Sequence, residues 1–241
     1  MTSGRYELHC HLDGSVRPDT IADLAVEAGI ELAGPVRARA VAPPDVGSLH
    51  AFLSYLDVAL DVLQTPSALR RAARELVEDW YADGVAYGEA RFAPQLHGRL
   101  GMSVDEAVTA VAAGLREGHA ATGVRTALLL CCLRHQSPEV SLRVADAAVR
   151  FARPANSALE TCPRCNVLTR AVKDLTAHPV DRLLRAGLRV TVSTDGRTTA
   201  DTTLEQEFAD LRRVFGWTAE QEARCRVNAA EAAFAARGPL A

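Results

Sequence analysis

The chain has 241 residues, 48% of them hydrophobic and 24% charged, and its formal net charge is −3. This size and apolar content suit one α/β barrel domain of about 250 residues, while the slight negative charge and the lack of a basic block argue against nucleic-acid binding. We expect a cytoplasmic protein, because the sequence shows no apolar leader or membrane-length run and its six cysteines indicate reduced thiols rather than a disulfide scaffold.

Strand-like and helix-like segments alternate along the chain. In chain order we expect a strand at 6–13, a helix at 17–29, a loop at 34–48, helices at 49–63 and 66–84, a strand at 85–94, a helix at 103–123, a strand at 125–134, a helix at 137–152, a strand at 156–163, a helix at 178–187, a strand at 188–195, and helices at 202–216 and 218–237. Gly29 is a typical helix stop, and Ser103 with Glu106 has the spacing of a capping box. Strands separated by helices indicate βαβ units and a parallel sheet, here of five strands.

Two histidines end the first strand, in the stretch YELHCHLDGS at 6–15. His9 and His11 are two residues apart and therefore share one face of the strand, whereas Cys10 points to the other. Two imidazoles on one face at the carboxyl end of a strand can bind one divalent metal ion. Two structural histidines are the alternative, and the Asp-Gly-Ser that follows directly favours a site.

The last strand also ends in a candidate ligand. In VTVSTDG at 190–196, alternation places Ser193 and Asp195 on one face, with Asp195 at the strand end. Such an aspartate either caps a helix or supplies a carboxylate to a metal ion or to water. The spacing alone leaves both roles open.

Taken together, these motifs resemble those of the adenosine deaminase family of metal-dependent amidohydrolases, from about residue 6 to residue 230. The resemblance is carried, in the family's order, by HCHLDGS (9–15), YGEARFAP (87–94), CCLRHQSPEVS (131–141), LETCPRCN (159–166) and the last barrel unit (178–208). The fourth motif is similar to the family's Glu-x-Cys-Pro-x-Ser-Asn strand, with Cys165 where the family has serine.

The resemblance implies a (β/α)8-type fold with its site at the carboxyl ends of the strands. It implies that His9, His11 and Asp195 bind a divalent metal ion, usually zinc in the family, and that Asp13 lies near the ribose of a nucleoside. In the family, the metal activates a water molecule that attacks the amino-bearing carbon of a purine. A glutamate protonates the ring nitrogen, a histidine steers the water, and ammonia leaves. The implied partner is a purine nucleoside or aminopurine, with no role for nucleic acid or a membrane.

Three family motifs are missing from the sequence. They are a Gly-Asp-Glu stretch, a His-Ala-Gly-Glu motif with the third metal histidine and the catalytic glutamate, and a His-Gly motif with the water-steering histidine. None of the seven histidines lies in such a motif, and VRFARP runs directly into ANSALETCP. At roughly 30 residues per βα unit, three units are absent. We therefore expect a single domain over 1–241 with an internal deletion near 154–156; Gly196 is a further departure, since the family commonly has a second aspartate there.

Loss of three units predicts an incomplete, TIM-barrel-derived fold with about five parallel strands. In a full barrel the retained strands are neighbours, so we expect the spatial order 156–163, 188–195, 6–13, 85–94 and 125–134. This arrangement keeps the two histidines and the aspartate on adjacent strands. It also leaves the inner face open and both outer strands bare, which predicts either a homo-oligomer or poor folding.

Other charged and sulfur-bearing residues have weaker signals. Cys162 and Cys165 have a spacing used by zinc and redox sites, but without a second pair we expect a structural role. Glu89 and Arg91 alternate along a buried strand and are expected to pair within the barrel wall, although both could approach the site. His178 precedes a proline at a helix start and is not expected to be a ligand.

Two hypotheses about function remain. The first is a metal-dependent deaminase of adenosine or another aminopurine, impaired because no recognisable catalytic glutamate or water-steering histidine is present. The second is a non-catalytic deaminase relic that binds metal or a partner without turnover. Family resemblance favours the first hypothesis, and the missing motifs favour the second.

Overall fold

The strands lie where the sequence predicts them. The computed structural model describes residues 4–131, 159–185, 187 and 189–233, together with positions 133, 136, 139–140, 143–144 and 147. Within these residues the strands are β1 (Arg5–His11), β2 (Val85–Phe92), β3 (Arg125–Leu130), β4 (Leu159–Thr161) and β5 (Val190–Val192). Each overlaps one of the five predicted strands.

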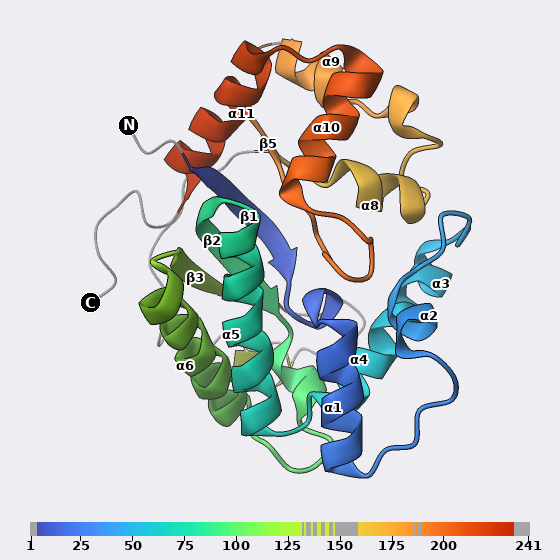
Figure 1. Cartoon of the computed structure of the whole chain (residues 1–241), viewed down its shortest axis with the longest axis vertical. Helices are drawn as coiled ribbons and strands as arrows, with labels where there is room; N and C mark the ends of the chain where they lie inside the picture. The colour runs from blue at the N-terminus through green and yellow to red at the C-terminus, as the bar shows by residue number, and fades with distance from the viewer. Residues whose placement is uncertain are drawn as a thin grey trace.

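The spatial order of the strands confirms the predicted wedge of a barrel. β1 pairs in parallel with β2, and β2 with β3; β4 pairs in parallel with β5. A parallel bridge between Cys10 and Asp195 joins the two sheets. The order is therefore β4, β5, β1, β2, β3, and the strands and helices of the described residues form a parallel α/β fold (Figure 1).

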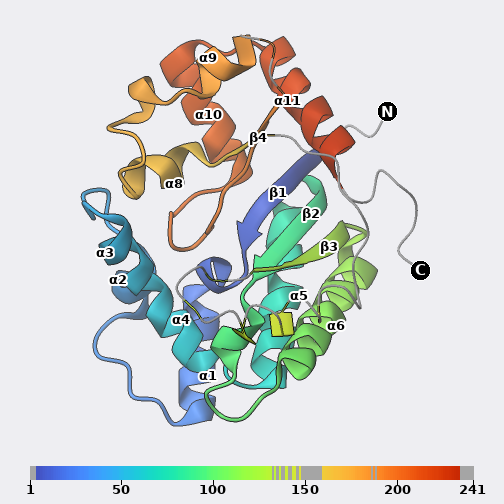
Figure 2. The same cartoon turned by 180° about the vertical axis from the view of Figure 1, so that it is seen from behind.

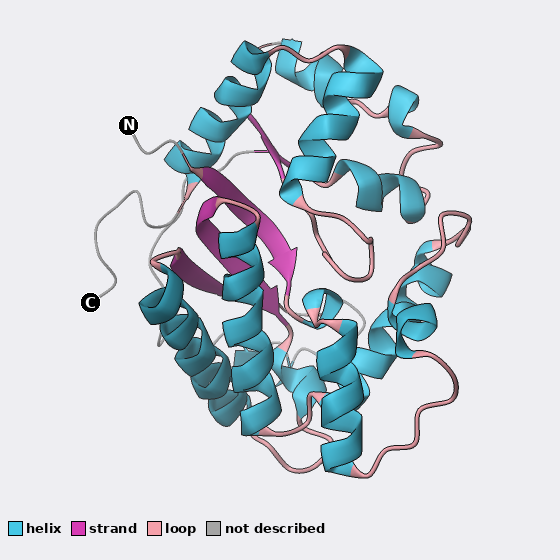
Figure 3. Ribbon diagram, in the orientation of Figure 1, coloured by secondary structure: helices cyan, strands magenta, loops and turns pink. Residues whose placement is uncertain are grey.

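The described residues also form helices. They are α1 (Pro18–Ala28), α2 (Val36–Ala40), α3 (Leu49–Leu53), α4 (Asp57–Val62), α5 (Pro66–Ala82), α6 (Val104–Thr122), α8 (Pro163–Leu168), α9 (Val180–Arg185), α10 (Leu204–Phe215) and α11 (Ala219–Ala232). Helices α5 and α6 lie side by side against β2 and β3 (Figures 1 and 3). From behind, β1, β2 and β3 lie in front of these two helices (Figure 2). None of the helices in the described part of the chain is long and apolar enough to cross a membrane.

Local signals in the sequence explain several helix ends. Ser103 accepts a hydrogen bond from the Glu106 amide while the Glu106 side chain accepts one from the Ser103 amide, so the predicted capping box is confirmed. Gly29 follows α1 in the left-handed conformation, with φ 65°. These caps fix the ends of helices whose apolar faces lie in the core.

The core between α5 and β2 is built around one large side chain. Trp80 on α5 is fully buried and lies over Gly88 of β2. A Cβ atom at Gly88 would be only 2.5 Å from the Trp80 ring. On the other side of α5, a Cβ atom at Gly114 of α6 would overlap the Arg70 carbonyl oxygen. Small residues therefore let the sheet and the two helices approach closely.

Three predicted elements differ from the structure. The helix predicted at 49–63 is interrupted by a 3₁₀ turn at Ser54–Leu56, where the Ser54 hydroxyl donates to the Ala51 carbonyl and competes with the backbone for it. The loop predicted at 34–48 contains the one-turn helix α2, which starts directly after Pro35. The strand predicted at 188–195 ends at Val192. The helix predicted at 137–152, apart from isolated positions, and the expected deletion point at 154–156 lie outside the described residues.

Strand β3 is the least covered strand of the larger sheet. All its residues are at least partly exposed, Arg125 more so than the rest, whereas most residues of β2 are buried. Among the described residues β3 pairs only with β2, so it is the outermost described strand at this end of the wedge. The homo-oligomer expected from such an edge stays a prediction.

A buried carboxyl group at the start of α10 predicts a pH-dependent stability. Glu207 is 1% exposed and accepts hydrogen bonds from the Arg164 amide and the Thr202 hydroxyl. Burial raises the pKa of Glu207 from 4.5 to about 8. The folded chain therefore keeps a proton that the unfolded chain has lost, and the free energy of unfolding falls as pH rises from about 5 to about 8. We expect Glu207→Gln to gain stability relative to the parent chain over this range, measured by urea unfolding at several pH values.

Glu205→Gln on the same helix is the matched control. The hydrogen bond from Arg212 lowers the pKa of Glu205, so its stabilising contribution is present above about pH 4.5 and is lost only as pH falls. The stability of this variant relative to the parent chain should not change between about pH 6 and about pH 8. Parallel curves for the Glu207→Gln variant and the parent chain would contradict the buried-proton argument.

Candidate metal centre

The two histidines of the first motif lie together at the carboxyl end of β1. His9 and His11 occupy alternate positions of the strand, as predicted, and their ring centroids are 5.5 Å apart. Both side chains are partly exposed. Since a parallel sheet gathers its functional groups at the carboxyl ends of its strands, this is the edge at which a ligand is expected.

Asp195 meets the two imidazoles from the turn that follows the neighbouring strand β5. Its backbone bridges β1, because the Asp195 amide donates to the His9 carbonyl over 2.8 Å and the His11 amide donates to the Asp195 carbonyl over 2.5 Å. Asp195 Oδ1 lies 3.7 Å from His9 Nε2 and 3.5 Å from His11 Nε2. The convergence predicted for these three side chains is therefore observed.

The backbone of Asp195 is in an unusual conformation. Its φ is +66°, in the left-handed region that residues other than glycine rarely adopt. The alternation assumed for Ser193 and Asp195 therefore does not continue to the end of the predicted strand. The turn continues into Gly196, where a Cβ atom would be 3.2 Å from the Gly14 carbonyl oxygen. A turn between β5 and α10, rather than strand geometry, thus aims the carboxylate at the histidines.

Glu160 orients the first histidine, a role that no pattern in the sequence predicts. Its carboxylate lies 2.7 Å from His9 Nδ1 and 2.9 Å from the Arg91 guanidinium. Although burial raises it, the pKa of Glu160 is lowered overall by the hydrogen bond from His9 and the charge of Arg91. Glu160 thus contacts His9 through Nδ1, while Nε2 of the same ring faces Asp195. Such a carboxylate–histidine pair commonly fixes a metal-binding imidazole. Arg91 therefore approaches the site. This is one of the two roles predicted for it from the sequence.

Asp13 lies beside the second histidine. Its Oδ1 is 3.9 Å from His11 Nδ1, and the residue is 8% exposed. Burial lowers the pKa of His11, against the opposing effects of Asp13 and Asp195. The neutral imidazole that results is the form that binds metal ions. The contact of Asp13 with a nucleoside stays a prediction.

A cysteine of α8, the helix after β4, contacts the cluster. The Cys165 thiol, in the short helix α8, donates to Asp195 Oδ2 over 2.8 Å. Burial and the nearby Asp195 carboxylate raise the pKa of Cys165. Its motif partner Cys162 is also buried. His178, as predicted, is not a member of the cluster: it accepts from the Val180 amide at the start of α9.

The donor set fits a divalent metal ion. The candidate ligand atoms of His9, His11 and Asp195 all lie within 4.8 Å of one another, and among the described residues no other group of three or more such side chains does so. Two ligands held about 2.0–2.2 Å from a tetrahedral ion are about 3.3–3.6 Å apart. The nitrogen–oxygen distances of 3.5 Å and 3.7 Å are close to this separation.

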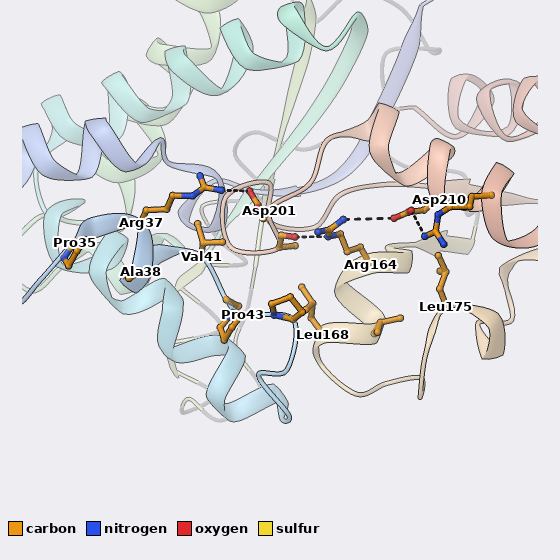
Figure 4. A pocket seen from close by; sticks show the side chains of 15 residues that line it. Pro35, Arg37, Ala38, Val41, Pro43, Arg164, Leu168, Leu175, Asp201 and Asp210 are labelled. Carbon is orange, nitrogen blue, oxygen red and sulfur yellow. Dashed lines mark hydrogen bonds and ion pairs between the residues drawn. The ribbon is translucent and has the colours of Figure 1, made fainter.

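A cavity adjoins helix α8. It has a volume of about 700 Å³ and is lined by residues of α2, the loop after it, α8 and α10. Figure 4 shows Arg37 paired with Asp201 and Arg164 paired with Asp210 across its wall. None of the three candidate ligands lines it. Helix α8 contributes to both places, since Arg164 and Leu168 face the cavity and Cys165 contacts Asp195.

Several solved structures are similar to this chain. Solved structures with the same fold include adenine deaminase from Arthrobacter aurescens, with a TM-score of 0.85, 24% identity and coverage of 97% of this chain and 95% of that one. Arabidopsis ADAL complexed with IMP has a TM-score of 0.83, 19% identity and coverage of 96% and 92%. An amidohydrolase from Burkholderia ambifaria with bound zinc has a TM-score of 0.75, 18% identity and coverage of 96% and 85%. At these identities the likeness establishes the fold.

Sequence comparisons establish the family. Adenosine deaminase from Enterococcus faecalis is 30% identical over 308 residues, covering 95% of this chain and 91% of that protein. Adenosine deaminase from Mycobacteroides abscessus is 31% identical over 324 residues, covering 94% and 89%. The family model described as Adenosine deaminase matches residues 5–159 and residues 151–238. The chain therefore belongs to the adenosine deaminase family.

Proposed function

We propose that the chain carries the metal-binding half of an aminopurine deaminase centre and has, at most, low hydrolytic deaminase activity towards adenosine or a related aminopurine. The observation that carries this proposal is the convergence of His9, His11 and Asp195 at the carboxyl ends of adjacent strands. Family membership supports the reaction class. The nucleotides bound by structural relatives, such as IMP in Arabidopsis ADAL, support a small purine-type ligand.

Each retained residue has a definable role in this proposal. A divalent ion such as zinc supplies Lewis acidity and makes water more acidic when bound. His9, held by Glu160, and neutral His11 would be its nitrogen ligands, and Asp195 its oxygen ligand. Asp13, beside His11, would orient a substrate hydroxyl group.

The groups that complete the reaction belong to a segment that we infer to be absent near 154–156. Two observations support this inference. The two matches to the family model meet at 151–159, and the alignment with the Enterococcus faecalis relative spans 308 positions although this chain has 241 residues. The third metal histidine, the catalytic glutamate and the water-steering histidine would all lie in that segment. A proton donor for the purine ring is therefore lacking in the sequence.

The second candidate function is a relic that binds metal or a partner without turnover. The missing glutamate and histidines favour it, and the retained ligand cluster is compatible with it. Ammonia release from adenosine discriminates between the two, since only a deaminase releases it. Self-association through the exposed β3 edge and a cytoplasmic location stay predictions under both.

Zinc binding tests the proposed centre directly. We expect the metal-free chain to bind one zinc ion, measured by calorimetric titration. His11→Ala should weaken binding at least about 100-fold, because losing a ligand costs more than the 10–100-fold typical of losing its hydrogen-bond partner. His50→Ala, which changes an exposed histidine of α3, should bind zinc like the parent chain. No binding by the parent chain, or equal loss in both variants, would contradict the proposed centre.

A further inference from the structure

The cavity that adjoins α8 has a largely apolar lining. Its volume of about 700 Å³ lies within the range of about 300–1,000 Å³ that is typical of small-molecule sites. Of the described residues that line it, all are apolar except five charged ones. Ala42, Leu168 and Ala200 are buried members of this lining and belong to one small apolar cluster. The cavity therefore suits a ligand with an apolar body.

The five charged residues leave one positive charge without a close partner. They are three arginines and two aspartates, namely Arg37, Arg164, Arg213, Asp201 and Asp210. Arg37 donates to Asp201 over 2.9 Å, and Arg213 donates to Asp210 over 2.6 Å. Figure 4 shows Arg164 between these two pairs. Because each aspartate already has its own arginine, Arg164 carries the remaining charge.

The side chain of Arg164 is held with its terminal nitrogens available to a ligand. Its Nε donates to the Ala200 carbonyl over 3.0 Å. Among the described residues its only ion pair is with Asp210, at 3.8 Å from Nη1, which is too long for a hydrogen bond. The Arg164 side chain is 38% exposed, compared with 65% for Arg37 and 69% for Arg213. Arg164 is thus the most enclosed of the three arginines.

We propose that this cavity binds a small organic acid with an apolar body, whose single carboxylate pairs with Arg164. A guanidinium group presents parallel N–H donors that match the two oxygens of a carboxylate. One negative charge also balances the unpaired arginine, whereas a phosphate monoester carries about −1.5 to −2 near pH 7. The apolar body would lie against Leu168 and Ala200. None of the three candidate metal ligands lines the cavity, so this second site needs no metal ion.

Calorimetric titration of the full-length chain with naphthalene-2-carboxylate tests the proposal, because naphthalene-2-carboxamide has nearly the same shape without the charge. We expect one carboxylate to bind, and the carboxamide to bind at least about tenfold more weakly, since hydrogen bonds between charged groups are the stronger ones. Arg164→Gln should weaken carboxylate binding at least about tenfold and leave carboxamide binding unchanged. Arg185→Gln, which changes an exposed arginine of α9 outside the cavity, should bind both compounds like the parent chain.

A gain of affinity gives a second test. Asp210→Asn removes a negative charge from the cavity wall and frees Arg213, so the carboxylate should bind at least about threefold more tightly. The proposal is overturned if the parent chain binds no carboxylate, if it binds the carboxamide equally well, or if Arg164→Gln keeps the parent affinity. The comparison of the two compounds uses the parent chain and therefore does not depend on whether a variant folds. Zinc binding is measured separately, so failure of this site leaves the proposed function unaffected.

Discussion

Ammonia release from adenosine by the purified, zinc-loaded chain is expected to be at least about 100-fold slower than release by the Enterococcus faecalis relative. Deamination needs a proton donor for the ring nitrogen and a group that steers the attacking water. The sequence offers no recognisable counterpart of either group. Each such positioned acid or base contributes about 10²–10⁴-fold, and the two effects need not multiply because the groups act together. The measurement is a steady-state ammonia assay with equal enzyme concentrations and added zinc.

Two variants measured in the same assay identify the source of any residual activity. His11→Ala should abolish activity that depends on the proposed centre, while His50→Ala should leave it unchanged. A rate within tenfold of the relative that is lost in His11→Ala would show the prediction to be wrong. Glu89, Cys165 or a neighbouring copy would then supply the missing groups. A specific activity that rises with protein concentration would single out the neighbouring copy.

Trp80→Ala is expected to lower the free energy of unfolding by about 3–5 kcal/mol, the range for truncating a large buried aromatic side chain. Trp80 is fully buried between α5 and the sheet, and Gly88 lies directly beneath its ring. The sheet and helix cannot fill the space that the indole leaves without a shift of backbone. Since domains of this kind are stable by only about 5–15 kcal/mol, the variant should unfold at much lower urea concentration, followed by far-ultraviolet circular dichroism.

The adjacent residue provides the control for this substitution. Tyr81 follows Trp80 in α5 and is 62% exposed. Tyr81→Ala removes an aromatic ring from the same turn of the same helix and should change the unfolding free energy by less than about 0.5 kcal/mol. Similar losses in both variants would mean that α5 tolerates aromatic truncation poorly for reasons other than burial.

Much of the fold follows from short-range signals. Period-two apolar segments flanked by helical ones predict the five strands, and caps such as Ser103 with Glu106 predict the helix ends. Predicting the strand order required two further facts. These are the order of the motifs in a full barrel and the absence of three βα units from this sequence. For the site, the spacing of His9 and His11 predicts their shared face, since that depends only on strand geometry.

Sequence patterns did not predict the contacts between distant segments. Glu160 reaches His9 across 151 positions, and no spacing rule relates them. The contact of Cys165 with Asp195 depends on how α8 leaves β4, so the cysteine was expected to be structural. Arg91 alternates with Glu89 along β2, yet its guanidinium pairs with Glu160 on another strand. Local periodicity determines which way a side chain points, whereas its partner depends on which strands become neighbours.

The left-handed backbone of Asp195 sets two evolutionary pressures against each other. Holding a residue with a Cβ atom in that conformation costs about 1–2 kcal/mol, which glycine would avoid and asparagine would reduce. Neither substitute would keep the carboxylate that faces His9 and His11. A lineage that no longer used the metal ion would gain stability by drifting to glycine or asparagine at this position. Aspartate at position 195 is therefore a marker by which retained metal binding can be distinguished from decay among close variants of this chain.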